Sequence, residues 1–218
     1  MSRRRRQASR GLKETFPIGR GAALGSVAYV LGYVVTYLFV RLSSDSADLG
    51  IVAALTDISQ FDITGWMFYN AHFVDVTATT SAAGQSQSES TNMLSEASNL
   101  AVPELFWYLV PIFFLILAGF IVAMTISQSS HTRKAVGAGA TVLVGYLPLS
   151  IAGLFLFGAS VETFGGGATA TIGPDKAMGI LFAGIVFPVV FGMLGGLLAS
   201  LVSTGGGTAI RSRVSRHG

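Results

Sequence analysis

The chain has 218 residues, of which 51% are hydrophobic and only 11% are charged, with a formal net charge of +3. A soluble domain usually carries about twice that charged fraction, so a chain this apolar needs lipid around much of its surface. Cysteine is absent, which excludes disulfides, thiol nucleophiles and cysteine-based metal sites. The preference for Arg over Lys, with acidic Ser/Thr-rich loops, is typical of salt-loving archaea, although a GC-rich genome also favours Arg.

Four apolar stretches are long enough to cross a membrane, since a spanning helix needs about 20 mostly apolar residues. We predict spans at 21–42, 104–126, 137–161 and 177–202. The predicted fold is therefore all-α, an integral membrane bundle of four transmembrane helices. A cleaved signal peptide is the alternative for the first span, because arginines precede it. Its apolar run is longer than a usual signal sequence, and Arg41 stands where cleavage needs small residues.

The positive charges are strongly sorted along the chain. All but two of the 14 basic residues lie in the two tails or in the short loop between the second and third spans, the exceptions being Arg41 and Lys176. Acidic residues show the opposite distribution. The positive-inside rule then places both termini in the cytoplasm of a multi-pass cell-membrane protein. The predicted cytoplasmic segments are 1–20, 127–136 and 203–218, and the predicted outside loops are 43–103 and 162–176.

The long outside loop has two parts of different composition. Residues 48–76 are apolar but interrupted by aspartates, which predicts an interfacial helical segment. Trp66 and Tyr69 would be interfacial residues at headgroup level, where Trp and Tyr rings are enriched. A re-entrant or lid segment over a cavity is the alternative. Residues 77–99 are rich in Ser, Thr, Gln and Asn and contain no aromatic residue, which predicts a flexible Ser/Thr-rich tether.

Small residues recur every four positions in the fourth span, as Gly184, Pro188, Gly192 and Gly196. Helices in lipid associate where small residues let their backbones approach, so this face is a predicted helix-packing site. The two helical hairpins also share a weak spacing pattern, which either duplication or chance would explain.

Three tyrosines, Tyr29, Tyr33 and Tyr37, lie on one helical face of the first span. Each hydroxyl requires a hydrogen-bond partner in an apolar environment. The face therefore packs against another helix or, as the alternative, forms a polar face along a solute path.

Catalytic patterns are missing from the sequence. It contains no zinc-protease, phosphate-loop or nucleophile-elbow motif, and its three histidines fall in separate segments. We therefore predict no enzymatic activity, no catalytic residue, no cofactor and no metal site. The expected partners are the lipid bilayer and a second copy or another membrane protein. Nucleic acid is not expected, because topology alone explains the basic tails.

The stretches GYVVTYLFV and GWMFYNAHFV, with the glycine- and proline-rich third and fourth spans, resemble a family of uncharacterised haloarchaeal four-pass membrane proteins. Some members carry the label "transporter". The resemblance implies a membrane location and a saline habitat, and it implies no catalytic residue. The expected function is a non-enzymatic structural or partner-binding membrane component of a halophilic archaeon. The alternative is a small solute transporter or channel subunit.

Overall fold

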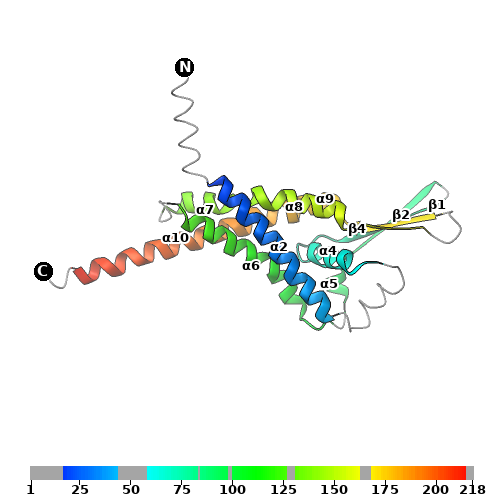
Figure 1. Cartoon of the computed structure of the whole chain (residues 1–218), viewed down its shortest axis with the longest axis horizontal. Helices are drawn as coiled ribbons and strands as arrows, with labels where there is room; N and C mark the ends of the chain where they lie inside the picture. The colour runs from blue at the N-terminus through cyan, green and yellow to red at the C-terminus, as the bar shows by residue number, and fades with distance from the viewer. Residues whose placement is uncertain are drawn as a thin grey trace, which may run out of the picture. The chain divides into compact units, whose positions relative to one another are not determined.

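A computed structural model describes residues 17–43, 58–82, 84–97, 100–126, 131–162 and 168–214. The N-terminal part of the predicted basic tail, the last four residues and the first half of the predicted interfacial segment, 48–57, lie outside the described residues. Figure 1 follows the chain from end to end.

Four helical stretches are long and apolar enough to cross a membrane, as predicted. The third consists of two helices, separated at Thr141, whose hydroxyl donates a hydrogen bond back to the Ala138 carbonyl oxygen at 2.6 Å. The fourth contains a π-helical segment. The stretches are α2 (Ile18–Ser43), α6 (Glu104–Met124), α7 (Thr132–Ala140) with α8 (Leu143–Leu156), and α9 (Lys176–Met178) with η1 (Gly179–Val186) and α10 (Phe187–Val214).

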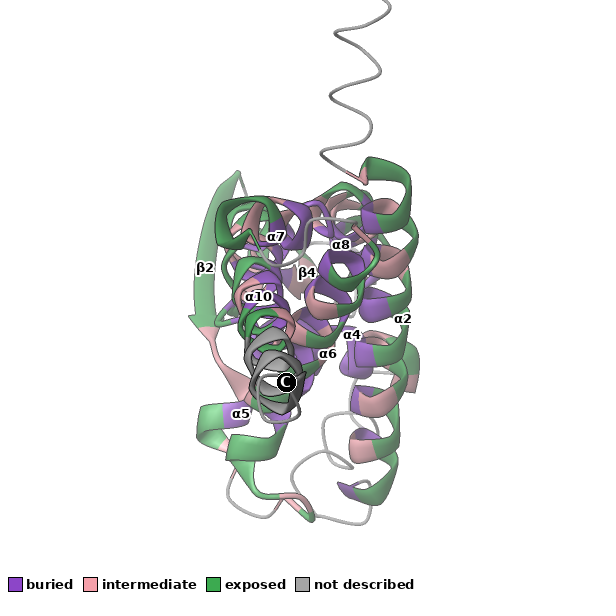
Figure 2. Cartoon of the chain, turned by 90° about the vertical axis from the view of Figure 1, so that its left-hand side faces the viewer, coloured by how far each residue is buried: buried purple, intermediate pink, exposed green. Residues whose placement is uncertain are grey.

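The helix ends differ most from the predicted spans in the third and fourth helical stretches. The third stretch begins at Thr132, before the predicted 137, and ends at Leu156, because the residues that follow enter a strand. The fourth continues as α10 to Val214, well into the predicted basic tail 203–218. Figure 2 shows buried residues along one side of α2 and exposed residues along the other, the pattern of a helix with one packed face.

The all-α prediction was wrong, because the chain also forms a four-stranded antiparallel sheet. Its order is β2–β1–β4–β3, so the first hairpin pairs with the second through β1 and β4. Both predicted outside loops contribute strands. The strands are β1 (Val76–Ala82), β2 (Gln85–Thr91), β3 (Ala159–Glu162) and β4 (Ala168–Pro174).

The sheet also corrects the predicted tether at 77–99. This segment forms β1, β2 and the short helix α5 (Met93–Glu96). Its composition favoured disorder because it offers little apolar area. The partner that orders it is β4, a distant segment of the chain, and Thr79 of β1 pairs with Thr171 of β4. Serine and threonine side chains add hydrogen bonds across β1 and β2, including Thr79 to Ser88 at 2.9 Å.

The described chain divides into two compact units, which we call the glycine unit and the sheet unit. Each long helical stretch contributes one part of its length to each unit. The glycine unit comprises residues 1–28, 113–146 and 187–218, and the sheet unit comprises 29–112 and 147–186.

Helices of the glycine unit touch through their backbones. A Cβ atom on Gly192 of α10 would lie 2.6 Å from the Gly139 carbonyl oxygen of α7. A Cβ atom on Gly195 would overlap the Ile116 carbonyl oxygen of α6. Real Cβ atoms do not approach other atoms this closely, so only glycine permits these contacts. α10 therefore packs backbone to backbone against both α6 and α7.

A second close contact in the glycine unit joins α2 to the third helical stretch. Cβ atoms on Gly25 and Gly145 would overlap the carbonyl oxygens of Val142 and Ala22, respectively. Next to them, the Ser26 hydroxyl donates a hydrogen bond to the Gly145 carbonyl oxygen at 3.3 Å. Small residues thus set the helix spacing here, as expected for association in lipid.

The core of the sheet unit is built around helix α4 (Gln60–Asn70). Ser59 caps this helix by accepting a hydrogen bond from the Asp62 backbone N–H at 3.1 Å. Every residue of α4 from Ile63 onward is buried. After α4 the chain turns back through Phe73, whose φ of 59° is unusual for a large side chain. The Phe73 ring stacks on Tyr108 of α6 at 5.0 Å.

Trp66 and Tyr69, which the sequence predicted to be interfacial, are enclosed by protein. Trp66 is 1% exposed, and its indole N–H donates to the Phe157 carbonyl oxygen at 3.0 Å. Tyr69 is fully buried and donates to the Ser150 carbonyl oxygen of α8. Local composition showed that these rings avoid water but not what covers them, and α2 and α8 do so here.

Candidate functional site

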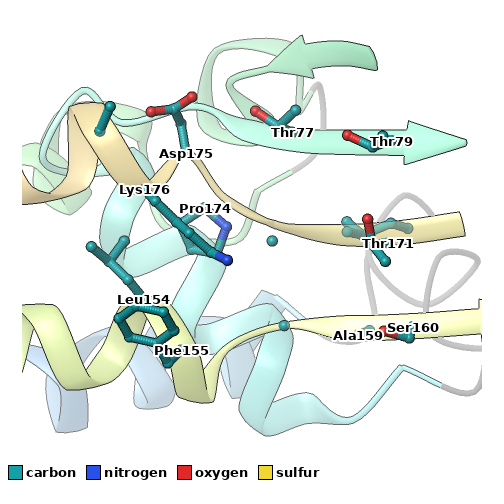
Figure 3. A pocket seen from close by; sticks show the side chains of 14 residues that line it. Thr77, Thr79, Leu154, Phe155, Ala159, Ser160, Thr171, Pro174, Asp175 and Lys176 are labelled. Atoms are coloured by element: carbon teal, nitrogen blue, oxygen red, sulfur yellow. The ribbon is translucent and has the colours of Figure 1, made fainter. Parts of the chain in front are cut away.

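The sheet unit contains a groove of about 570 Å³ between the sheet and the ends of α8 and α9 (Figure 3). A volume of this size is typical of sites for small ligands. Its lining combines hydroxyl side chains from three strands with one ammonium group and an aromatic ring. The lining includes Thr79, Thr171 and Ser160 on the sheet, and Phe155, Gly158 and Lys176 near the helices.

A row of hydroxyl groups crosses the sheet at this groove. Thr79 of β1 is the register partner of Thr171 of β4, which in turn pairs with Ser160 of β3. Residues directly opposite one another on neighbouring strands present their side chains on the same face. The three hydroxyls therefore form a continuous polar strip.

Two members of this strip have hydroxyls available for a ligand. Thr79 already shares a hydrogen bond with Ser88 of β2 at 2.9 Å. In the part of the chain that the structure describes, the hydroxyls of Thr171 and Ser160 have no hydrogen-bond partner in the protein. Each hydroxyl can donate one hydrogen bond and accept two. They are the natural polar contacts for a molecule seated in the groove.

Lys176 supplies the positive charge of the groove. Its Nζ atom lies 5.2 Å from the centre of the Phe155 ring, a cation–π arrangement. Among the described residues, no carboxylate lies within ion-pair distance of this ammonium group. The neighbouring Asp175 carboxylate accepts a hydrogen bond from the Met178 backbone N–H at 2.7 Å and so caps α9. Figure 3 shows it turned away from the Lys176 ammonium.

Two glycines keep the groove open. Gly158 and Gly173 belong to its lining and place no side chain in it. A Cβ atom on Gly158 would meet only the Ile172 carbonyl oxygen, at 3.9 Å, which is ordinary contact distance. On Gly173 it would lie 3.2 Å from the Phe157 carbonyl oxygen, which is tight. Gly158 is therefore the position at which a larger side chain would fill the groove without disturbing the fold.

Sequence reasoning did not identify this groove. Its residues come from the predicted tether, from the end of the predicted third span and from the predicted outside loop 162–176. Lys176 was interpreted only as a topology marker. The alternation of Thr77, Thr79 and Ser81 has the period of two that indicates a strand. That signal was available, but the polar composition of 77–99 outweighed it.

The predicted polar tyrosine face divides between different surroundings. The Tyr29 hydroxyl lies 3.5 Å from that of Tyr69, inside the sheet unit. Tyr33 donates to the Phe61 carbonyl oxygen at 3.2 Å and stacks on Phe157 at 5.3 Å. Tyr37 is 38% exposed. The first two thus pack against α4 and its neighbours.

The predicted helix-packing residues also fall in different units. Gly192 and Gly196 lie in the glycine unit, where a Cβ atom on Gly196 would overlap the Ala135 carbonyl oxygen. Pro188, which follows the π-helical segment, belongs to the glycine unit as well. Gly184 belongs to η1 in the sheet unit, where an added Cβ atom would lie 2.7 Å from Leu147.

Two buried polar side chains in the sheet unit, His72 and Ser150, were not foreseen from the sequence. His72 is fully buried, and its Nδ1 lies 2.7 Å from the Phe68 carbonyl oxygen. Burial lowers the pKa of His72 from 6.5 to about 4, because desolvation disfavours the imidazolium form. Ser150 is fully buried, and its hydroxyl has no hydrogen-bond partner.

Among the described residues, no group of three His, Cys, Asp or Glu side chains could hold a metal ion.

A family of unknown function, DUF7978, matches residues 1–203 of the chain. The chain belongs to this family. No curated protein and no solved structure matches it. The DUF7978 family carries no assigned activity that could be transferred to the groove.

Proposed function

We propose that this DUF7978 protein is a multi-pass membrane protein that acts as a non-enzymatic binding component, with both termini in the cytoplasm and the sheet outside the cell. The pairing of β1 with β4 is the observation that carries the topology. Paired strands lie on the same side of a membrane, so the chain between them crosses an even number of times. The two helical stretches between them, α6 and α7–α8, satisfy that condition.

The same pairing relates the two termini to each other. One long helical stretch precedes β1 and one follows β4. With one crossing each, both termini lie on the side opposite to the sheet. The sorted basic residues identify that side as the cytoplasm by the positive-inside rule. We also propose a haloarchaeal origin for the protein, on the basis of its Arg-rich composition.

The binding role is supported by where the polar surface lies. The hydroxyl strip, the groove and the exposed strand β2 all belong to the sheet, on the proposed outer side. In the glycine unit, backbone contacts close the described helices against one another. That closure favours a binding component over a channel. The partners that fit are the bilayer, a second copy or another membrane protein, with no role for nucleic acid.

Single-cysteine labelling tests the topology, because the natural chain contains no cysteine. A membrane-impermeant maleimide should label Ser86→Cys in β2 on intact cells. It should label Arg133→Cys in α7 only after permeabilisation. Labelling of Arg133→Cys on intact cells would overturn the orientation, and equal labelling of both in a soluble extract would overturn membrane insertion.

The binding role has its own test on β2. A photo-crosslinker at Ser88, which lies on the exposed strand, should give a discrete adduct in the native membrane. An adduct of twice the chain mass identifies a second copy, and any other discrete mass identifies a different partner. A crosslinker at Ile18, an exposed residue at the start of α2, is the control. Failure of Ser88 to give any adduct beyond the control pattern would contradict partner binding through the sheet.

A solute transporter or channel subunit is the second candidate function. The π-helical segment η1 favours it, because π-helical turns occur frequently at functional sites. The unpartnered Ser150 hydroxyl lies close to this segment, 3.9 Å from an added Cβ atom on Gly184. Solute flux through reconstituted vesicles that Ser150→Ala abolishes would support this candidate over the first.

A further inference from the structure

The groove combines three features that belong together in a lipid site: a cation, hydroxyl donors and an exposed apolar rim. Phe155, which lines the groove, is 68% exposed, and Leu156 beside it is 61% exposed. On the other helix, Met178 is 42% and Leu181 48% exposed. Gly179 of η1 packs against Leu154 of α8, so the two helices that carry these apolar residues are in contact beside the groove.

We propose that the groove binds the phosphate headgroup of an anionic phospholipid in the outer leaflet. This inference rests on the proposed membrane insertion. Lys176 offers the charge for the phosphate, and the hydroxyls of Thr171 and Ser160 offer hydrogen bonds to its oxygens. The hydrocarbon tails of the lipid lie along the exposed apolar residues of α8 and η1.

The position of Lys176 supports a lipid over a free anion. It begins α9 at the outer end of the fourth helical stretch, where a lysine stem lies along apolar surface and its ammonium reaches the headgroups. A freely dissolved anion would gain nothing from the exposed rings and aliphatic side chains beside it. A lipid would contact both the Lys176 ammonium, through its headgroup, and the exposed apolar side chains, through its tails.

The placement of the two charged groups of the groove favours an anionic headgroup. The Asp175 carboxylate also lines the groove, but it caps α9 and is turned away from the Lys176 ammonium (Figure 3), so a headgroup seated beside Lys176 and the hydroxyl strip meets the ammonium group. A phosphatidylglycerol headgroup places its charge on the phosphate and offers hydroxyls to the Ser/Thr strip. Phosphatidylcholine should therefore bind more weakly.

The experiment measures the thermal unfolding midpoint of the full chain in mild detergent at constant ionic strength. Three additions are compared: short-chain phosphatidylglycerol, short-chain phosphatidylcholine and inorganic phosphate. Phosphatidylglycerol should raise the midpoint at the lowest concentration. Lys176→Met should weaken its apparent affinity about tenfold or more, since a charge-assisted hydrogen bond contributes that much. Lys176→Arg should retain most of the apparent affinity for phosphatidylglycerol.

Two further variants test whether the lipid effect depends on the groove itself or only on the presence of a positive charge. Gly158→Leu fills the groove at a position with room for a side chain and should abolish the phosphatidylglycerol effect while leaving the lipid-free midpoint nearly unchanged. Arg41→Met removes the other basic residue of the proposed outer side, whose guanidinium donates to the Gln60 side chain at 3.3 Å. It should leave the lipid effect unchanged, as the matched control.

Several results would overturn the proposal. An equal midpoint shift with inorganic phosphate would show a simple anion site. An equal shift with phosphatidylcholine, or an equal loss in Arg41→Met, would show non-specific lipid contact. These failures would leave the four-pass topology intact, because the cysteine labelling tests it separately. If the cysteine labelling failed to show the predicted pattern, both the proposed topology and the lipid site that rests on it would lose their basis.

Discussion

The backbone contact between α10 and α7 makes a quantitative prediction for Gly192→Ala. The added Cβ atom would lie 2.6 Å from the Gly139 carbonyl oxygen and 2.7 Å from Cγ2 of Val142. The first neighbour is backbone, so a rotamer change cannot relieve the overlap, and the helices must separate. Overpacking of this kind costs about 1–3 kcal/mol, which exceeds the gain of up to about 1 kcal/mol from replacing a helical glycine by alanine.

Gly19→Ala is the matched control. Gly19 also lies in a helix, and nothing lies within 4 Å of the position its Cβ atom would occupy. It should therefore show only the propensity gain and leave stability equal or slightly higher. The readout is the free energy of unfolding in mixed micelles, followed by circular dichroism. If Gly192→Ala were as stable as Gly19→Ala, the backbone contact would not exist.

The reciprocal contact supplies a stricter test. A Cβ atom on Gly139 would overlap the Gly192 carbonyl oxygen, so Gly139→Ala forces apart the same two helices. Once the first alanine has separated them, the second meets less resistance. The double variant should lose less stability than the sum of the single losses, since residues in direct contact are not additive. Strict additivity would place the two glycines in separate contacts.

Three further predictions concern the core of the sheet unit. Trp66→Phe should lose about 1–3 kcal/mol of stability, because the Phe157 carbonyl oxygen is left without the indole N–H at 3.0 Å; a chemical unfolding curve measures this, and an unchanged curve would contradict the bond. Iodide should quench tryptophan fluorescence poorly, because Trp66 and Trp107 are each 1% exposed; quenching as efficient as that of free tryptophan would refute the enclosed α4. Stability should fall as pH drops from 6.5 towards 4, because burial lowers the pKa of His72 from 6.5 to about 4, and the unfolded chain then takes up a proton that the folded chain excludes. The shift corresponds to at most about 3 kcal/mol, and His72→Gln should flatten this part of the stability–pH curve; an unchanged slope would show that His72 is accessible to protons.

Helix number and approximate span positions followed from the sequence because a membrane-spanning helix satisfies its backbone hydrogen bonds locally and must be apolar over its length. Nothing remote is needed to recognise such a segment. Even there, the end of the third stretch was missed. Residues after Leu156 are apolar enough for a span, yet they pair as β3 with β4.

The sheet was missed for the opposite reason. Strand β1 acquires its place by pairing with β4, and the register partner of Thr79 is Thr171. A strand depends on partners that are distant along the chain, whereas composition describes only the local segment. The Ser/Thr content of 77–91 therefore indicated disorder. In the folded chain the same side chains bond across β1 and β2, as Thr77 does with Ser90 at 2.9 Å.

The aromatic segment was recognised as apolar, but the sequence did not show which parts of the chain surround it. Large rings between aspartates fit an interfacial helix and a buried helix equally well, because both exclude water from one face. The deciding features are contacts such as that of Gly65 with the Phe157 ring, where an added Cβ atom would overlap the ring carbons. Only the folded chain brings those two residues together.

The two units hold their helices together by different kinds of contact, although these helices share the same apolar composition. In α2, Gly21 and Gly25 bring the backbone against Thr141 and Val142, so no other element fits between them. Further along the same helix, Tyr33 packs against the rings of Phe61 and Phe157, and α4 fills the intervening space. A helix in lipid gains no hydrophobic energy by leaving lipid for protein, so its contacts must come from close packing or from hydrogen bonds. Glycine supplies the close packing in the glycine unit. Tyrosine, tryptophan and serine supply the hydrogen bonds in the sheet unit.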